Sequence, residues 1–84
     1  MEKLSQMPNI GPALEEQLMR VGVDTPEQLI KIGSRAAWCR IKQIDASACI
    51  HRLYALEGAV QGIRKNLLPQ EVKASLKAFY NENK

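Results

Sequence analysis

The sequence contains few of the side chains from which metal sites and disulfide frameworks are built. Its 84 residues include one histidine and two cysteines, and Cys39 and Cys49 do not form a CxxC pair. Two cysteines cannot make the disulfide framework of a small secreted domain. One histidine, His51, is too few for an ordinary zinc site. We therefore expect no metal, no cofactor, and two reduced cysteines buried as small apolar residues.

Long hydrophobic runs are also missing. No apolar stretch reaches the length that a membrane span needs. No basic segment followed by an apolar one opens the chain in the manner of a leader. The expectation is a soluble, cytoplasmic protein without membrane contact. At 84 residues the chain has room for a single domain, residues 1–84, with a core from about residue 4 to residue 80.

Groups that could support catalysis are equally scarce. Several serines would compete for the single histidine, and none lies in the strand–turn–helix context of a nucleophile elbow. The paired carboxylates Glu15 and Glu16 diverge by about 100° if they lie on a helix. No glycine-rich phosphate-binding loop is present. We predict a binding or regulatory module and not an enzyme.

Helical periodicity runs through the whole chain, and no alternating pattern predicts a strand. The start signals include Pro12 and a capping box from Thr25 to Gln28. With Asp45 as its N-cap, a continuous apolar seam predicts a long central helix over about 46–67: Cys49, Leu53, Leu56, Val60, Ile63 and Leu67. The chain as a whole predicts an all-α, compact bundle of about five helices after a short opening helix: one over 12–21, two separated by Gly33, the long helix, and a last one from Pro69.

Two glycines inside the predicted long helix require an explanation, because each costs about 1 kcal/mol relative to alanine. Gly58 and Gly62 follow Tyr54 at intervals of four residues and therefore share one face. Small residues on one face favour close approach by another element. We interpret Tyr54, Gly58 and Gly62 as an interaction row. Its partner is either a neighbouring helix of the same chain or the second subunit of a homodimer.

Positive charge is concentrated in the middle of the chain, although the net charge is only +3. Residues 31–65 carry seven Lys and Arg residues against two acidic ones, whereas residues 1–30 carry two against five. The basic middle is a candidate nucleic-acid patch: Arg35, Arg40, Lys42, Arg52, Arg64 and Lys65. The alternative is a solvated basic face with no ligand.

The opening segment contains a hairpin motif formed by Pro8, Asn9, Ile10 and Gly11. It resembles a helix-hairpin-helix element, in which backbone N–H groups contact a DNA phosphate at a helix N-terminus. Asn9 stands where such elements usually have glycine, and asparagine enters the left-handed region readily. Acidic residues follow the hairpin instead of basic ones. This favours a structural hairpin over a DNA-binding one.

Four segments carry a wider resemblance that covers about residues 4–79: Met7-Pro8-Asn9-Ile10-Gly11, Leu29 to Gly33, Arg40-Ile41-Lys42, and Leu53-Tyr54-Ala55-Leu56-Glu57-Gly58-Ala59 with Gly62 and Arg64. Together they resemble the C-terminal domain of the TfoX/Sxy family of bacterial competence regulators. The resemblance implies an all-helical fold of the helix-hairpin-helix or SAM-like kind and a link to the control of DNA-uptake genes. It also implies a further domain before this one, and it supplies no catalytic residues.

Two functional hypotheses follow. The first is a non-enzymatic regulatory module that acts through protein–protein contacts in transcription regulation. The second is a weak, sequence-independent DNA-binding module that uses the basic middle of the chain, with affinity that falls steeply with salt. The expected partner is accordingly a protein, with DNA and a second copy of the chain as alternatives.

Overall fold

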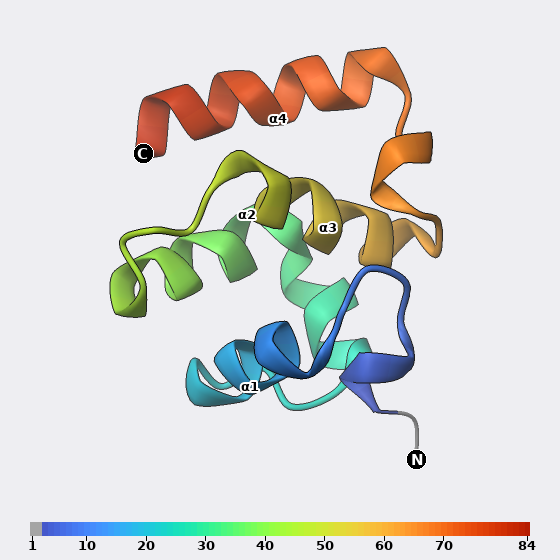
Figure 1. The fold of residues 1–84 in the computed structure, drawn as a ribbon, viewed down its shortest axis with the longest axis vertical. Helices are drawn as coiled ribbons and strands as arrows, with labels where there is room; N and C mark the ends of the chain where they lie inside the picture. Colours follow the sequence, from blue (N-terminus) through green and yellow to red (C-terminus); the bar gives the residue numbers. More distant parts are fainter. Residues whose placement is uncertain (1–2) are drawn as a thin grey trace.

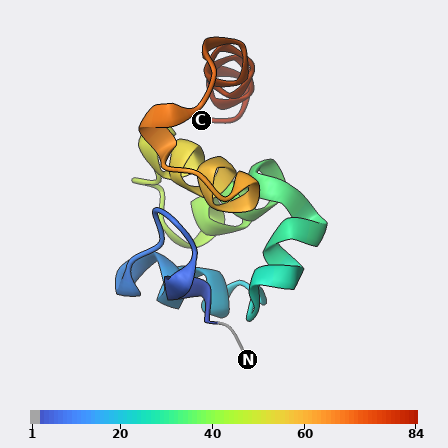
Figure 2. The ribbon, with the colours of Figure 1, turned by 90° about the vertical axis from the view of Figure 1, so that its right-hand side faces the viewer.

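The computed structural model describes residues 3–84, and all of its regular structure is helical (Figure 1). The elements are the 3₁₀ turn η1 (Leu4–Gln6), α1 (Pro12–Arg20), α2 (Pro26–Ile44), α3 (Ile50–Gln61), the 3₁₀ turn η2 (Lys65–Leu67) and α4 (Gln70–Asn83). Helices α1 and α4 lie at opposite ends of the molecule, with α2 and α3 between them (Figures 1 and 2). Residues 3–84 contain no strand, so the all-α prediction is confirmed.

The first two helices begin where the sequence signals predict. Pro12 lies at the start of α1, after Gly11 as its N-cap. Thr25 is the N-cap of α2, and its hydroxyl oxygen accepts a hydrogen bond from the backbone N–H of Gln28 at 3.2 Å. The Gln28 side chain accepts in return from the backbone N–H of Asp24 at 2.6 Å. These reciprocal bonds satisfy amides that a helix start leaves without partners.

Gly33 divides α2 into two helical parts, as the sequence pattern predicts. Gly33 interrupts it with φ 85° and ψ 166°, a conformation that glycine adopts at little cost. Ser34, which follows the kink, is buried, and its hydroxyl donates to the Glu57 carboxylate of α3 at 2.6 Å. The described residues thus comprise four labelled α-helices, of which α2 is in two parts, and two 3₁₀ turns.

The prediction of a long central helix over 46–67 is wrong. Helix α3 begins after Cys49 and ends at Gly62, whose φ of 76° places it in the left-handed region. Asp45 is the C-cap of α2 and not the N-cap of α3. The apolar spacing continues through Ile63 and Leu67 although the helix does not, because a left-handed glycine redirects the chain without disturbing the sequence period. Leu67 is exposed as a result.

The core is centred on Trp38, which is fully buried and whose indole N–H donates to the Cys49 carbonyl oxygen at 3.2 Å. Helix α4 packs against it through Phe79 and Tyr80, both in edge-to-face contact with the indole ring. Leu76 is the fully buried residue of α4. Within residues 3–84 no helix has the length and apolarity needed to cross a membrane.

The cysteines differ from the prediction that both are buried. Cys39 is half-buried against the core, whereas Cys49 is exposed. Cys49 precedes α3 as its N-cap and does not lie on the helical apolar seam. Its side chain is therefore on the surface even though its sequence spacing matches the seam.

Candidate interaction groove

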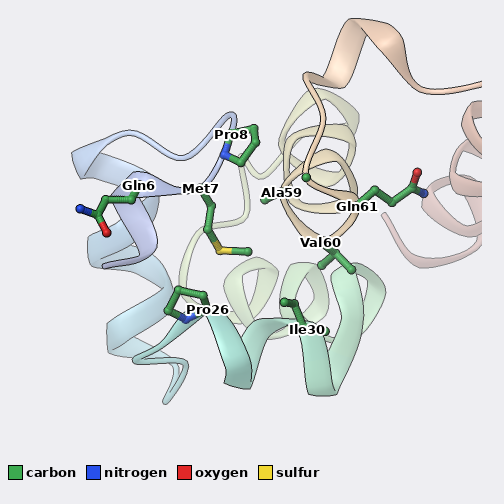
Figure 3. Close-up of a pocket in the computed structure, with 9 residues that line it drawn as sticks. Gln6, Met7, Pro8, Pro26, Ile30, Ala59, Val60 and Gln61 are labelled. Carbon is green, nitrogen blue, oxygen red and sulfur yellow. The ribbon is translucent and has the colours of Figure 1, made fainter. Parts of the chain in front are cut away.

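A groove lies where the hairpin, the first half of α2 and the end of α3 meet (Figure 3). Its volume is about 340 Å³. The lining residues are uncharged: Gln6, Met7, Pro8, Pro26, Ile30, Ala59, Val60, Gln61 and Gly62. We refer to these nine residues as the groove. A surface hollow without a charged side chain is unusual for a chain of which 25% of residues are charged.

The groove presents apolar side chains from three separate segments. Met7, which precedes the hairpin, points toward Ile30 of α2 and Val60 of α3, which lie close to each other on the opposite side (Figure 3). Ile30 keeps 54% of its surface exposed, and Pro26 beside it is buried. A half-exposed isoleucine next to a hollow marks a surface that gains free energy when a partner covers it.

Asn9 fixes the hairpin wall of the groove. It has φ 70°, so the prediction that it adopts the left-handed conformation is confirmed. Its side-chain amide donates to the Ile63 carbonyl oxygen at 2.9 Å and to the Ala55 carbonyl oxygen at 3.4 Å. Its side-chain oxygen accepts from the backbone N–H of Lys65 at 3.0 Å. One side chain thus holds the hairpin to the middle of α3 and to the segment that follows the helix.

Gly58 makes room for that contact. A Cβ atom at Gly58 would lie 2.7 Å from the Ile63 carbonyl oxygen and closer still to Nδ2 of Asn9. The close approach that the sequence predicts is therefore real, but the partner is the hairpin loop of the same chain and not a helix. Gly58 is buried by this contact.

The predicted interaction row does not form one surface. Gly58 is buried, Tyr54 is half-buried beside the core, and Gly62 is the exposed C-cap of α3 that borders the groove. Because Asn9 covers Gly58, a second subunit cannot reach it in this fold. The α3 helix ends before Gly62, so the three residues do not share a helical face.

The hairpin residues take different positions. Pro8 lines the groove, Asn9 faces α3, Ile10 is buried, and Gly11 is the exposed N-cap of α1. Glu15, one of the acidic residues that follow the hairpin, also makes a structural contact. Its carboxylate accepts a hydrogen bond from the backbone N–H of Ser5 at 3.0 Å. A carboxylate beside the hairpin repels phosphate, which agrees with a structural role for this segment.

The candidate basic patch is divided among separate hollows. Arg35 donates to the Ser75 hydroxyl at 2.8 Å beside α4, and Arg40 donates to the Val21 carbonyl oxygen at 3.3 Å beside the end of α1. Lys42 donates to the Ala46 carbonyl oxygen at 2.6 Å. Arg64 is exposed just before η2. These contacts engage the long basic side chains with the fold at different sites.

The remaining two basic residues, Arg52 and Lys65, share a hollow of about 310 Å³ between α1 and α3. Arg52 forms an ion pair with Asp45 at 2.9 Å, and Gln17 of α1 donates to the same carboxylate oxygen at 2.9 Å. Hydrogen bonds from Ser47, Gln17 and Arg52 hold the pKa of Asp45 well below its usual range. Asp45 thereby joins α1 and α3 at the end of α2.

Cys49 lines the same hollow. Hydrogen bonding to the backbone of Arg52 is the main cause that lowers the pKa of its thiol, supported by the His51 backbone and the Arg52 charge against partial burial. His51 is exposed. Within residues 3–84 no group of three or more His, Cys, Asp and Glu residues is arranged to hold a metal ion.

Sequence reasoning missed the groove. Ile30 is a large apolar residue directly after the buried Leu29 on a helix, and an apolar residue on the outer side of a helix is the signal that could have identified the surface. Met7 and Val60 read as ordinary core positions in the sequence, because nothing local shows that the segments around them leave a gap.

Comparisons with known proteins identify relatives over nearly all of this chain. The family model of the TfoX C-terminal domain matches residues 1–80. Protein Sxy of Escherichia coli strain K12 is 34% identical over 68 residues, which are 81% of this chain and 32% of Sxy. The chain thus spans about one third of the length of that relative.

Two crystal structures of Listeria monocytogenes chains have closely similar folds. One, of an uncharacterized protein in a triclinic form, has a TM-score of 0.95 and 47% identity, and the match covers 96% of this chain and 92% of that one. The other, of a protein of unknown function in a tetragonal form, has a TM-score of 0.94 and 47% identity over 96% of this chain and 99% of that one.

Proposed function

This chain belongs to the family of TfoX C-terminal domains, and on that premise we propose that it is a non-enzymatic, cytoplasmic regulatory module that contacts a protein partner in the control of DNA-uptake genes. Family membership supports a domain of the competence-regulator kind. The transcriptional role and the protein contact are the proposal. So is the helix-hairpin-helix or SAM-like description, which the turn between η1 and α1 supports.

The groove is the observation that carries this proposal. It combines an apolar lining from three segments with a half-exposed isoleucine, Ile30, and none of its lining residues within 3–84 is charged. Covering such a surface with another apolar surface removes it from water and contributes roughly 25 cal/mol per Å² buried. Regulation through a partner protein needs a surface of this type.

The hairpin and the basic residues favour DNA less. The Asn9 side chain is turned into the fold, and Glu15 places a negative charge beside the hairpin amides. Arg35, Arg40 and Arg52 each hydrogen bond within the chain at a different site. Non-specific DNA binding depends on several cations that reach the phosphates together.

A paired substitution tests the protein-binding role. Ile30 and Met19 are equally exposed, at 54% and 53%, but only Ile30 lines the groove. In the bacterium that encodes the chain, Ile30→Glu should lower a DNA-uptake gene reporter to the level of a deletion strain. A carboxylate buried without a partner in an apolar contact weakens association by roughly tenfold or more. Met19→Glu should leave the reporter at the wild-type level.

Circular dichroism and thermal unfolding of both variants provide the folding control, since neither side chain is buried. Equal reporter activity in the two variants, with both proteins folded and equally abundant, would show that the groove has no part in the function. A reporter that is unaffected even by deletion of the gene would refute the regulatory role itself.

A further inference from the structure

We propose that the occupant of the groove is a short, uncharged, aliphatic peptide segment of a partner protein. This inference rests on the proposed function and names the chemistry of the partner. It follows from the lining of the groove, its size, its rigidity and the polar groups at its edges.

The charge of the lining selects the occupant. Three other hollows contain charged side chains: Arg52 and Lys65 between α1 and α3, Arg35, Glu57 and Glu71 beside α4, and Lys31 and Arg40 beside the α1–α2 turn. The groove has none among the residues that the structure describes. A charged side chain buried there would lose its hydration without gaining a counter-charge. An uncharged apolar side chain meets no such penalty.

The size of the groove limits the occupant to a short segment. Its volume of about 340 Å³ lies at the small end of the range of roughly 300–1,000 Å³ typical of ligand sites. A few aliphatic side chains fill such a space, whereas a folded domain would need a broad interface around it. These side chains would enter between Met7 on one side and Ile30 and Val60 on the other (Figure 3).

Two glutamines at the edges can serve the backbone of a bound peptide. Gln6 accepts a hydrogen bond from the backbone N–H of Lys3 through Oε1, and Gln61 donates to Glu57 through Nε2. Each amide has a second polar atom: Nε2 of Gln6 is a donor and Oε1 of Gln61 is an acceptor. A peptide backbone offers a carbonyl oxygen to Nε2 of Gln6 and an N–H group to Oε1 of Gln61. These contacts need no charge on the bound segment.

The groove is also rigid before anything binds. Asn9 hydrogen bonds the hairpin wall to the chain that follows α3, and Gly58 allows the two to touch. A preformed wall avoids the entropy cost of ordering a loop on binding. Weak contacts with a short peptide therefore suffice for measurable affinity.

Selection from displayed random short peptides on the purified full chain tests the inference. Enriched sequences should contain aliphatic residues without net charge. As labelled synthetic peptides in fluorescence anisotropy, they should bind with affinity that changes less than about threefold between about 50 and about 200 mM salt. Ile30→Glu should weaken this binding at least about tenfold, and Met19→Glu should leave it unchanged.

Several results would overturn the inference. They are enrichment of charged peptides, steep salt dependence, no enrichment above an unrelated protein, or equal binding by the Ile30→Glu variant. The other possible occupant is a second copy of this chain, which light scattering tests. A wild-type dimer that Ile30→Glu dissociates would assign the groove to that second copy and overturn the inference. If the groove binds neutral peptides but Ile30→Glu leaves the reporter unchanged, only the proposed function is contradicted. If Ile30→Glu lowers the reporter but the groove binds no neutral peptide, only this inference is contradicted.

Discussion

The two ends of α3 border hollows of similar size and opposite chemistry. The groove at the C-terminal end measures about 340 Å³ and is lined without a charge, and the hollow at the N-terminal end measures about 310 Å³ and contains Arg52 and Lys65. In the N-terminal hollow the polar groups hold the fold together, because Asp45 joins Arg52 of α3 to Gln17 of α1. In the groove, by contrast, the apolar side chain of Ile30 remains half-exposed.

This difference indicates that the N-terminal hollow is a structural site, whereas the groove is available to a partner. The DNA hypothesis arises from the basic middle of the chain, and two of its six candidate residues, Arg52 and Lys65, line the N-terminal hollow. Yet an arginine already paired with a carboxylate attracts a phosphate less than a free one does. The groove has no comparable internal pairing, so its surface is the one that association can still stabilise.

The largest effect should come from removing the hydrogen bonds that hold the groove wall. Asn9→Ala loses the bonds to Ile63 and Lys65 and places alanine at φ 70°. We expect urea unfolding to report a loss of about 3 kcal/mol, from hydrogen bonds worth about 1 kcal/mol each and a left-handed cost of about 1 kcal/mol. Neutral peptides should no longer bind, because the wall is no longer fixed.

Two companion variants separate these contributions. Asn9→Gly keeps the left-handed backbone at little cost and should recover about 1 kcal/mol of the loss. Gly58→Ala, which normally favours a helix by about 1 kcal/mol, should destabilise instead because its Cβ meets the Ile63 carbonyl oxygen at 2.7 Å. A stabilised Gly58→Ala variant would show that the hairpin does not press on α3 as described.

A smaller effect is expected from the N-terminal hollow. Asp45→Asn weakens the ion pair with Arg52 and should lower the Tm at neutral pH while leaving peptide binding in the groove intact. The pKa of Asp45 is depressed by folding, so its stabilisation is present above its usual pKa of about 3.9 and is lost as the pH falls through the folded value.

Thermal unfolding of wild type and Asp45→Asn over a pH series measures that loss. The Tm difference between the two proteins should be constant near neutral pH and shrink as the pH falls below about 4. A difference that does not change with pH would mean that the Asp45 carboxylate contributes through shape and not through charge.

The smallest effect should be binding of DNA. Anisotropy of a labelled duplex at about 50 mM salt should show no saturation at protein concentrations up to about 10⁻⁴ M, the weak end of the non-specific range. Tight binding that salt weakens steeply would restore the basic patch as the functional surface. In that case the double variant Arg40→Glu with Lys42→Glu should abolish it, and Met19→Glu should not.

Local signals determined much of this protein from the sequence alone. The all-helical class, the start of α1 at Pro12, the cap at Thr25 and the left-handed Asn9 each depend on a few neighbouring residues, so they could be predicted. The family resemblance was likewise carried by short segments. Each of these features is a property of residues that lie close together in the chain.

Tertiary structure alone decided the features that depend on distant residues. The apolar period passes through Gly62 unbroken, so the sequence could not show that α3 ends there. Asp45 precedes α3 in a good capping position, but its carboxylate instead binds Gln17 of α1 and Arg52 of α3. The groove needs Met7, Ile30 and Val60 from three segments. Whether apolar side chains become core or open surface depends on how closely such segments pack, and no local pattern encodes that distance.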